Sequence, residues 1–362
     1  MAQFVEPSQK LQLSAPFEME GDIDVPMKRA LITGVTGQDG SYLAELLLEK
    51  GYKVFGFARQ ESWYKANCAS HLVGRIEVLF GDVSEGIDLA TAVQDAKPDE
   101  IYNLASQSRP GESWSRAPET LLVNGLAAVR LFEAVRHNCP RARIYHASSS
   151  EMFGQTDVQC QHEQTPFNPV NPYAAAKVYA HQMAGIYRDS YGMYIASGIL
   201  FNHESERRPL HFLPQKVAYG AACQALNITS SPDRNERGRP IVEDGKLALG
   251  NLQVSRDWGY APDFVRAMWM ILQQDLPTDF VIGTGLSHTL QDLCEVAYQS
   301  VGRDWKKCVF SDPVLVRPLE PRKTVADPAK AKEMLGWQPS VSFEEMVGRM
   351  VQAQIRRLQR FV

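Results

Sequence analysis

The sequence predicts an α/β fold in which a doubly wound parallel sheet carries a smaller, non-contiguous C-terminal α/β lobe. Apolar, β-prone segments alternate with helical patterns between residues 29 and 201 of the 362-residue chain, as in right-handed βαβ units. A glycine-rich turn joins the first of these segments to the first helix. Beyond residue 201 the alternation becomes irregular, and this change predicts the second lobe.

The composition is that of an ordinary globular protein. It is 44% apolar and 22% charged, and its net charge of −4 gives no electrostatic case for nucleic-acid binding. No apolar run is long enough to cross a bilayer, and residues 1–27 lack the apolar core of a secretory signal. The six cysteines form no C-x-x-C pair, and the eight histidines show no paired metal spacing. We therefore expect a cytoplasmic protein with reduced thiols, no metal, and neither nucleic-acid nor membrane partners.

The first predicted strand, 29–33, runs directly into a G-x-x-G-x-x-G turn. Gly34 permits the tight turn, and Gly37 lets the backbone approach a pyrophosphate. Gly40 lets the following helix, 41–50, pack closely on the strand. This arrangement predicts a dinucleotide site with the phosphates at the helix N-terminus.

The second predicted strand, 53–57, ends close to Arg59. In folds of this type an acid at this strand end binds the ribose 2′-hydroxyl of NAD, whereas an arginine suits the 2′-phosphate of NADP. Arg59 therefore favours NADP. Glu61 lies close enough to keep NAD open, and Arg59 as a plain solvated residue is the other interpretation.

Two further strand ends, after strands 75–80 and 100–104, are expected to face the cofactor. Asp82 follows the first of them and either meets the adenine amino group or caps a helix. Small residues follow the second, as far as Ser108, and would let the cofactor lie close. The next predicted helix, 120–138, has a Leu/Val stripe that is typical of a core or subunit contact.

The end of the predicted strand 143–147 changes abruptly in character. The strand is apolar, but hydroxyl-rich and acidic residues follow it, among them Ser149 and Glu151. A buried parallel strand has this pattern when its carboxyl end opens onto a site. These two side chains are therefore candidates for a catalytic site.

A helix that begins at Pro172 supplies the other candidates. Tyr173 and Lys177 are four residues apart, so on a helix they share one face. The lysine cation should lower the pKa of the neighbouring phenol. A phenol prepared in this way can take a hydroxyl proton while the carbon beneath it loses hydride.

The rest of the chain is expected to divide between the sheet and the lobe. A strand over 194–200 leads to Asn202, and 279–282 is a later strand. Residues 227–246, rich in Pro, Gly, Asn and charge, are expected to form a long surface loop, followed by a compact motif over 247–251 and 255–258. The predicted domains are an N-terminal extension (1–27), an NADP-binding Rossmann-type core (28–201), mainly substrate lobe (202–256) with the 227–246 insertion, a return to the core (257–285), and mainly substrate lobe with a C-terminal helix (286–362).

These motifs, in this order, resemble the extended short-chain dehydrogenase/reductase superfamily and, within it, the GDP-mannose 4,6-dehydratase family. The resemblance runs from about residue 28 to about residue 351. The glycine and Y-x-x-x-K motifs are shared across the superfamily, whereas G-Q-D-G and L-F-N-H-E-S are closer to the dehydratases. The matching segments are V-T-G-Q-D-G-S-Y-L-A (35–44), A-S-S-S-E-M-F-G (147–154), N-P-Y-A-A-A-K (171–177), Y-G-M-Y (191–194), G-I-L-F-N-H-E-S (198–205), R-D-W-G-Y-A (256–261) and M-I-L-Q-Q (270–274).

The resemblance implies an internal redox elimination that converts GDP-mannose to GDP-4-keto-6-deoxymannose. Tyr173 would remove the C4 hydroxyl proton while hydride passes to NADP, and Lys177 would hold the cofactor ribose. Glu151 would then take the C5 proton, the C6 hydroxyl would leave as water, and the hydride would return to C6. Ser149, where the family usually has Thr, would hydrogen-bond the C4 oxygen. The chemistry agrees on Glu151, because elimination needs a carboxyl that is base first and acid afterwards.

The same resemblance assigns the binding residues. The expected cofactor-binding residues are Gly34, Gly37, Gln38, Asp39, Gly40, Arg59, Asp82, Val83, Leu104, Ala105, Ser106, Tyr173, Lys177 and His203. The expected substrate-binding residues are Ser108, Asn202, Lys216, Arg256, Arg317 and Glu320. Among these, the guanidinium of Arg256 suits a pyrophosphate.

Three departures from the family pattern concern the sugar rather than the chemistry. Arg109-Pro110 follows Ser108 where small, aromatic or β-branched residues are usual. The 227–246 insertion lies near the expected nucleotide lobe. Pro321-Arg322 stands where the family prefers Val-Asp after Glu320.

Alternatives to a GDP-mannose dehydratase are a dehydratase of another GDP-sugar, such as a GDP-heptose, a GDP-4-keto-6-deoxy-sugar reductase, and a catalytically silent NADP-binding subunit. Glu151 opposes the reductase, because net reduction requires no C5 base. The joint presence of Ser149, Glu151, Tyr173 and Lys177 opposes the silent subunit. A homodimer or homotetramer is expected.

Overall fold

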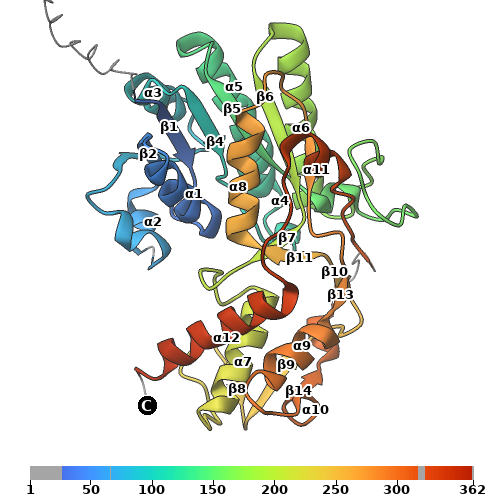
Figure 1. Cartoon of the computed structure of the whole chain (residues 1–362). Coiled ribbons are helices and arrows are strands. Elements are labelled where there is room, and N and C mark those ends of the chain that lie inside the picture. The colour runs from blue at the N-terminus through green and yellow to red at the C-terminus, as the bar shows by residue number, and fades with distance from the viewer. Residues whose placement is uncertain (1–26, 66, 317–322, 361–362) are drawn as a thin grey trace, which may run out of the picture.

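The computed structural model describes residues 27–65, 67–316 and 323–360. Its centre is a seven-stranded sheet in the order β12-β6-β5-β4-β1-β2-β3, in which every neighbouring pair is parallel (Figure 1). The predicted parallel α/β fold is thereby confirmed. The strands are β1 (Arg29–Thr33), β2 (Lys53–Ala58), β3 (Glu77–Phe80), β4 (Glu100–Asn103), β5 (Arg143–Ser149), β6 (Ile195–Leu200) and β12 (Phe280–Ile282).

Helices cover both faces of the sheet, as expected of a doubly wound fold. On one face α1 (Gln38–Glu49) packs against α8 (Ala261–Leu272), and Trp337, just beyond α11 (Ala329–Leu335), joins their apolar cluster. On the other face lie α3 (Gly86–Ala96), α5 (Ala127–Asn138) and α6 (Pro172–Tyr191). The short elements between them are α2 (Gln60–Lys65), η1 (Asn67–Leu72), η2 (Glu112–Trp114) and η4 (Ser150–Phe153).

Two helices differ from their predicted bounds. The first begins at Gln38 rather than at residue 41, so Gly40 lies inside it. The predicted helix 120–138 is three segments: α4 (Ala117–Leu121), a π-helical turn η3 (Leu122–Leu126) and α5. The π-turn contains a buried polar residue, Asn124, whose side chain hydrogen-bonds to backbone outside the helix.

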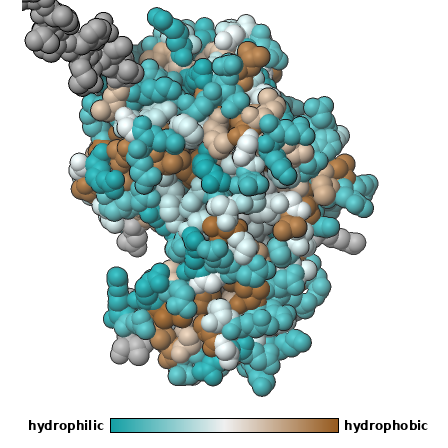
Figure 2. Space-filling view, in the orientation of Figure 1, coloured by the Kyte–Doolittle hydropathy of each residue, from teal (hydrophilic) through white to brown (hydrophobic). Residues whose placement is uncertain are grey.

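A C-terminal lobe lies below the sheet, across a narrower waist (Figure 2). Its apolar cluster draws on α7 (Leu213–Ala225), α9 (Leu290–Gln299), α12 (Phe343–Leu358) and a small sheet, β14-β9-β8. The remaining elements are β7 (Asn202–Glu204), β8 (Val242–Glu243), β9 (Lys246–Leu249), β10 (Ser255–Arg256), β11 (Trp258–Tyr260), β13 (His288–Thr289), α10 (Trp305–Cys308), β14 (Val309–Ser311) and η5 (Pro313–Leu315).

The 227–246 insertion is not simply the surface loop that its composition predicts. It contains strand β8, which pairs antiparallel with β9, and its Ile241 is buried. Asp233 accepts hydrogen bonds from the Tyr219 hydroxyl at 2.9 Å and from Arg357 at 2.7 Å. The insertion is therefore fixed to α7 and α12, although more than half of its residues, including Arg237, are exposed at the surface as predicted.

Candidate active site

The glycine turn lies at the carboxyl end of β1, where the prediction places it. Gly34 has a φ of +74°, and a Cβ there would lie 2.9 Å from the Ala105 backbone. A Cβ on Gly40 would lie 2.4 Å from the Gly34 carbonyl oxygen, so helix and turn approach as closely as expected. Gly37 is the N-cap of α1 and makes no side-chain cap. The backbone N–H groups at this helix start suit a phosphate group.

The predicted cofactor residues Gln38, Asp39 and His203 lie together and bind one another. His203 Nε2 is 2.9 Å from Asp39 Oδ2, and Gln38 Nε2 donates to the His203 carbonyl oxygen at 3.1 Å. Burial alone would lower the pKa of His203, but the Asp39 carboxylate outweighs it and the pKa is raised. These contacts tie the glycine turn to β7.

The segment after β4 is held by two polar side chains that sequence reasoning missed. Thr33 Oγ1 accepts from the backbone N–H groups of Leu104 and Ala105, both at 3.1 Å. Asn124 Oδ1 accepts from the Ser106 hydroxyl at 2.9 Å and from the next backbone N–H at 2.8 Å. A lone Asn in an apolar helix was the available signal.

Arg59 and Asp82 lie at the ends of β2 and β3, close enough for the Arg59 guanidinium to act on the Asp82 carboxyl. Burial raises the pKa of Asp82, but hydrogen bonds from Ser84 and the Arg59 guanidinium bring it below its usual value. Asp82 Oδ1 accepts from both the Ser84 backbone and its hydroxyl, and Val83 lies within this turn. The helix-cap alternative for Asp82 is wrong, because Glu85 is the N-cap of α3. Glu61, the residue that kept NAD open, pairs instead with Lys65 at 2.5 Å.

The four predicted catalytic residues come from the end of β5 and the start of α6. Ser149 Oγ accepts from the Glu151 backbone N–H at 3.3 Å. Asn171 Nδ2 donates to Glu151 Oε2 at 3.0 Å, and Asn171 Oδ1 caps α6 by accepting from the Ala174 N–H at 2.8 Å. One asparagine therefore fixes the carboxylate relative to the helix that carries Tyr173.

The expected effect of Lys177 on Tyr173 is wrong for this structure. Burial raises the pKa of Tyr173 to about 12, and the Glu151 carboxylate adds to the rise, against the nearby hydroxyls of Ser149 and Ser106. Lys177 Nζ donates to the Ala147 carbonyl oxygen at 2.9 Å and lies 5.9 Å from the Tyr173 ring centre. Burial also lowers the pKa of Lys177, to about 8. Desolvation thus outweighs the cation.

The predicted substrate residues are more scattered. Asn202 pairs with Trp258 where β7 meets β11, and the buried Arg256 lies just before β11. Lys216 lies on α7 and pairs with Glu236 of the insertion, whereas Ser108 is exposed after β4. The predicted contacts Arg317 and Glu320, and the departure Pro321-Arg322, lie outside the described residues.

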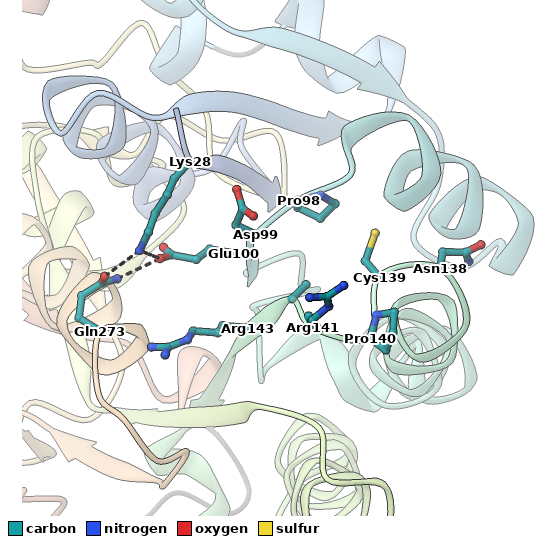
Figure 3. A pocket seen from close by; sticks show the side chains of 11 residues that line it. Lys28, Pro98, Asp99, Glu100, Asn138, Cys139, Pro140, Arg141, Arg143 and Gln273 are labelled. Atoms are coloured by element: carbon teal, nitrogen blue, oxygen red, sulfur yellow. Dashed lines mark hydrogen bonds and ion pairs between the residues drawn. The ribbon is translucent and has the colours of Figure 1, made fainter. Parts of the chain in front are cut away.

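A hollow of about 680 Å³ lies at the other end of the sheet, where strands β1, β4 and β5 begin (Figure 3). Lys28 Nζ and Gln273 Nε2 both donate to the buried Glu100 carboxylate there, at 3.0 and 3.3 Å. Ligands of open parallel sheets bind at the carboxyl ends of the strands. This hollow is therefore separate from the candidate site.

Among the described residues, no three His, Cys, Asp or Glu side chains gather as a metal site would require. Within the same ranges, no helix has the length and apolarity to span a membrane. All six cysteines are free thiols.

The doubly wound sheet, with its glycine turn and a Tyr-Lys helix at the carboxyl edge, defines an extended short-chain dehydrogenase/reductase. Residues 31–350 match the family model described as GDP-mannose 4,6 dehydratase. The chain belongs to this family.

Sequence relatives extend over nearly the whole chain. GDP-mannose 4,6 dehydratase 1 of Arabidopsis thaliana is 43% identical over 347 residues, covering 92% of each protein. GDP-mannose 4,6 dehydratase of Homo sapiens is 37% identical over 364 residues, covering 93% of this chain and 94% of the relative.

Solved structures share the fold at lower identity. dTDP-glucose 4,6-dehydratase from Bacillus anthracis, in complex with NAD, has a TM-score of 0.77 at 20% identity, covering 92% of this chain and 98% of that one. RMD from Pseudomonas aeruginosa, complexed with NADPH, has a TM-score of 0.74 at 18% identity, covering 91% and 100%.

Proposed function

We propose that this protein is an NADP-dependent GDP-mannose 4,6-dehydratase, which produces GDP-4-keto-6-deoxymannose. The observation that carries the proposal is the placement of Glu151. Its carboxylate is bound by Asn171, two residues before Tyr173, and it lies close enough to act on the Tyr173 phenol. A dehydratase needs an acid–base carboxyl beside the tyrosine that accepts the C4 hydroxyl proton, and a reductase does not. The names of the sequence relatives support GDP-mannose as the substrate.

The residues divide the proton transfers between them. Tyr173 takes the proton of the C4 hydroxyl, and Ser149 donates a hydrogen bond to the C4 oxygen. The chemistry that NADP would supply when bound is that of a hydride acceptor for C4 and a hydride donor for C6. Glu151 takes the C5 proton, which the C4 ketone has made acidic, and donates it to the C6 hydroxyl as that group leaves as water. Addition of hydride at C6 leaves an enolate, and C5 of this enolate takes the proton that Tyr173 removed from the C4 hydroxyl, which returns the tyrosine to its starting state. Lys177, with its pKa near 8, is charged at neutral pH and supplies a cation beside the tyrosine.

The residues at the cofactor end favour NADP over NAD. Arg59 follows the end of β2 and acts electrostatically on Asp82, while Glu61 is paired with Lys65. A guanidinium suits a 2′-phosphate, and a carboxylate engaged elsewhere is not available to a 2′-hydroxyl. The glycine turn and the uncapped start of α1 fit the pyrophosphate.

The test is incubation with a panel of GDP-sugars without added reductant, with loss of one water read by mass spectrometry. We expect turnover of GDP-mannose. Turnover of a GDP-heptose instead would show that the substrate is another GDP-sugar. A requirement for added reductant would favour the reductase, and the absence of turnover with bound NADP would favour a silent subunit.

We also propose that the chain forms a homo-oligomer. Apolar side chains are exposed along the adjacent α4, η3 and α6, including Leu121 and Ile186, each 51% exposed. A second copy of the chain would cover them. The molar mass in solution tests this proposal.

A further inference from the structure

The 227–246 insertion places a carboxylate on a predicted substrate contact. Lys216 Nζ donates to both carboxylate oxygens of Glu236, at 3.3 and 3.2 Å. The Lys216 side chain is 22% exposed, whereas that of Glu236 is 50% exposed. The cation is therefore part of the wall, and the carboxylate covers it from the solvent side.

This pair borders a hollow of about 330 Å³ between the insertion and the start of α7. His211 and Arg234 line the same hollow. The insertion is held in this position, because Asp233, three residues before Glu236, accepts hydrogen bonds from Tyr219 and Arg357. The contact between Glu236 and Lys216 is thus built into the lobe.

A third segment, the loop after β4, adds charge to this place. Burial raises the pKa of Glu236, but a backbone hydrogen bond, Lys216 and Arg109 together bring it below its usual value. Burial, with Arg109 and Arg208, lowers the pKa of His211 to about 4, so this histidine is neutral at physiological pH. Two cations, Lys216 and Arg109, therefore act on the Glu236 carboxylate.

We propose that Glu236 is a specificity-determining residue that competes with the ligand's diphosphate for Lys216. This proposal rests on the proposed function, in which Lys216 is a predicted contact of the GDP-sugar and the diphosphate is the group whose charge suits its ammonium. A ligand gains that contact only by displacing a carboxylate, so groups with little negative charge gain little there. The insertion thereby makes the site favour a highly charged nucleotide by a small factor.

The experiment is calorimetric binding of GDP to the full chain and to Glu236→Gln. We expect the variant to bind GDP about two- to five-fold more tightly, the scale of a partly exposed ion pair. Glu243→Gln removes the same charge from the exposed part of the same insertion and should leave GDP affinity unchanged. In a Lys216→Ala background, the effect of Glu236→Gln should disappear.

Equal or weaker GDP binding by Glu236→Gln would overturn the proposal, since the carboxylate would then be neutral or would position Lys216. An equal gain in GDP affinity with Glu243→Gln would also overturn the proposal, because the lower net negative charge of the insertion would then explain the result. GDP binding requires no turnover. A failure to dehydrate GDP-mannose would therefore refute the proposed function and leave this binding test readable.

Discussion

The carboxyl edge of the sheet and the insertion side of the lobe hold their charged groups in opposite ways. At the edge, Tyr173 and Lys177 are 8% and 4% exposed, and Lys177 donates to a backbone carbonyl oxygen. On the lobe side, Lys216–Glu236 and Arg109–Glu112 are ion pairs that solvent reaches. Removing one partner of a buried hydrogen-bonded pair costs much free energy, because the other partner is left buried and unpaired. An exposed ion pair contributes little free energy. Single substitutions at the carboxyl edge should therefore reduce turnover strongly. Single substitutions on the lobe side should change the choice of ligand only weakly.

The largest expected effect is at Glu151. Glu151→Gln keeps shape and polarity but cannot exchange a proton, so turnover should fall by about 10²–10⁴-fold. Hydride transfer from C4 should survive better, because Tyr173 and Lys177 are unchanged. A single turnover should then accumulate reduced cofactor, visible by absorbance.

The reaction in heavy water can contradict the assignment of Glu151 as the C5 base. If the carboxylate is the C5 base, the unaltered protein should place deuterium at C5 of the product. Product without deuterium there would rule out a solvent-exchanging base. Weaker substrate binding with normal elimination would assign Glu151 to the sugar hydroxyls instead.

Arg59→Ala tests the cofactor end of the same edge. Loss of a charge-assisted contact to the 2′-phosphate should weaken NADP binding by about 10- to 100-fold and leave NAD nearly unchanged. Dissociation constants for both cofactors give the measurement. An equal loss for NAD and NADP would contradict the assignment.

The buried state of Lys177 predicts a pH limit. Its pKa of about 8 lies below its ordinary 10.5, so the cation is present below pH 8 and lost above it. If the cation is needed, kcat/KM should fall about tenfold per pH unit above that point. Lys177→Arg, which keeps its charge, should flatten this fall even if it is slower overall. Between these pH values the unfolded chain binds the extra proton, so this group's contribution to the unfolding free energy rises with pH.

The smallest expected effect is on the lobe side, at Arg109. Arg109→Val should change the ranking of GDP-sugars by a few-fold in kcat/KM, on the order of an exposed ion pair. Arg136→Val is the matched control, because Arg136 forms a similarly exposed i,i+3 pair with Glu133 at the end of α5, just before β5 begins. An unchanged ranking would show that Arg109 does not face the sugar.

The same contrast explains what the sequence could predict. Strand and helix alternation, the glycine turn and the Tyr-Lys spacing are local patterns, and all seven strands of the main sheet were predicted near their observed bounds. The raised pKa of Tyr173 was not predictable, because it depends on burial by distant segments. The anchoring of the insertion was missed for the same reason, since Asp233 and Arg357 are 124 residues apart. Asn124 gave only the signal of one polar residue in an apolar stripe.

The last strand of the main sheet has a consequence for how the chain reaches its native state. β12 pairs with β6 through Phe280 and Gly198, yet the first segments of the lobe lie between them in the chain. During synthesis, the sheet therefore stays incomplete until much of the lobe has emerged. A fragment that stops at residue 201 would leave β6 as an unpaired edge and would lack α8 over α1. We expect such a fragment to aggregate. In the full chain we expect the sheet and the C-terminal lobe to fold as one cooperative unit, so that limited proteolysis releases neither part as a stable fragment.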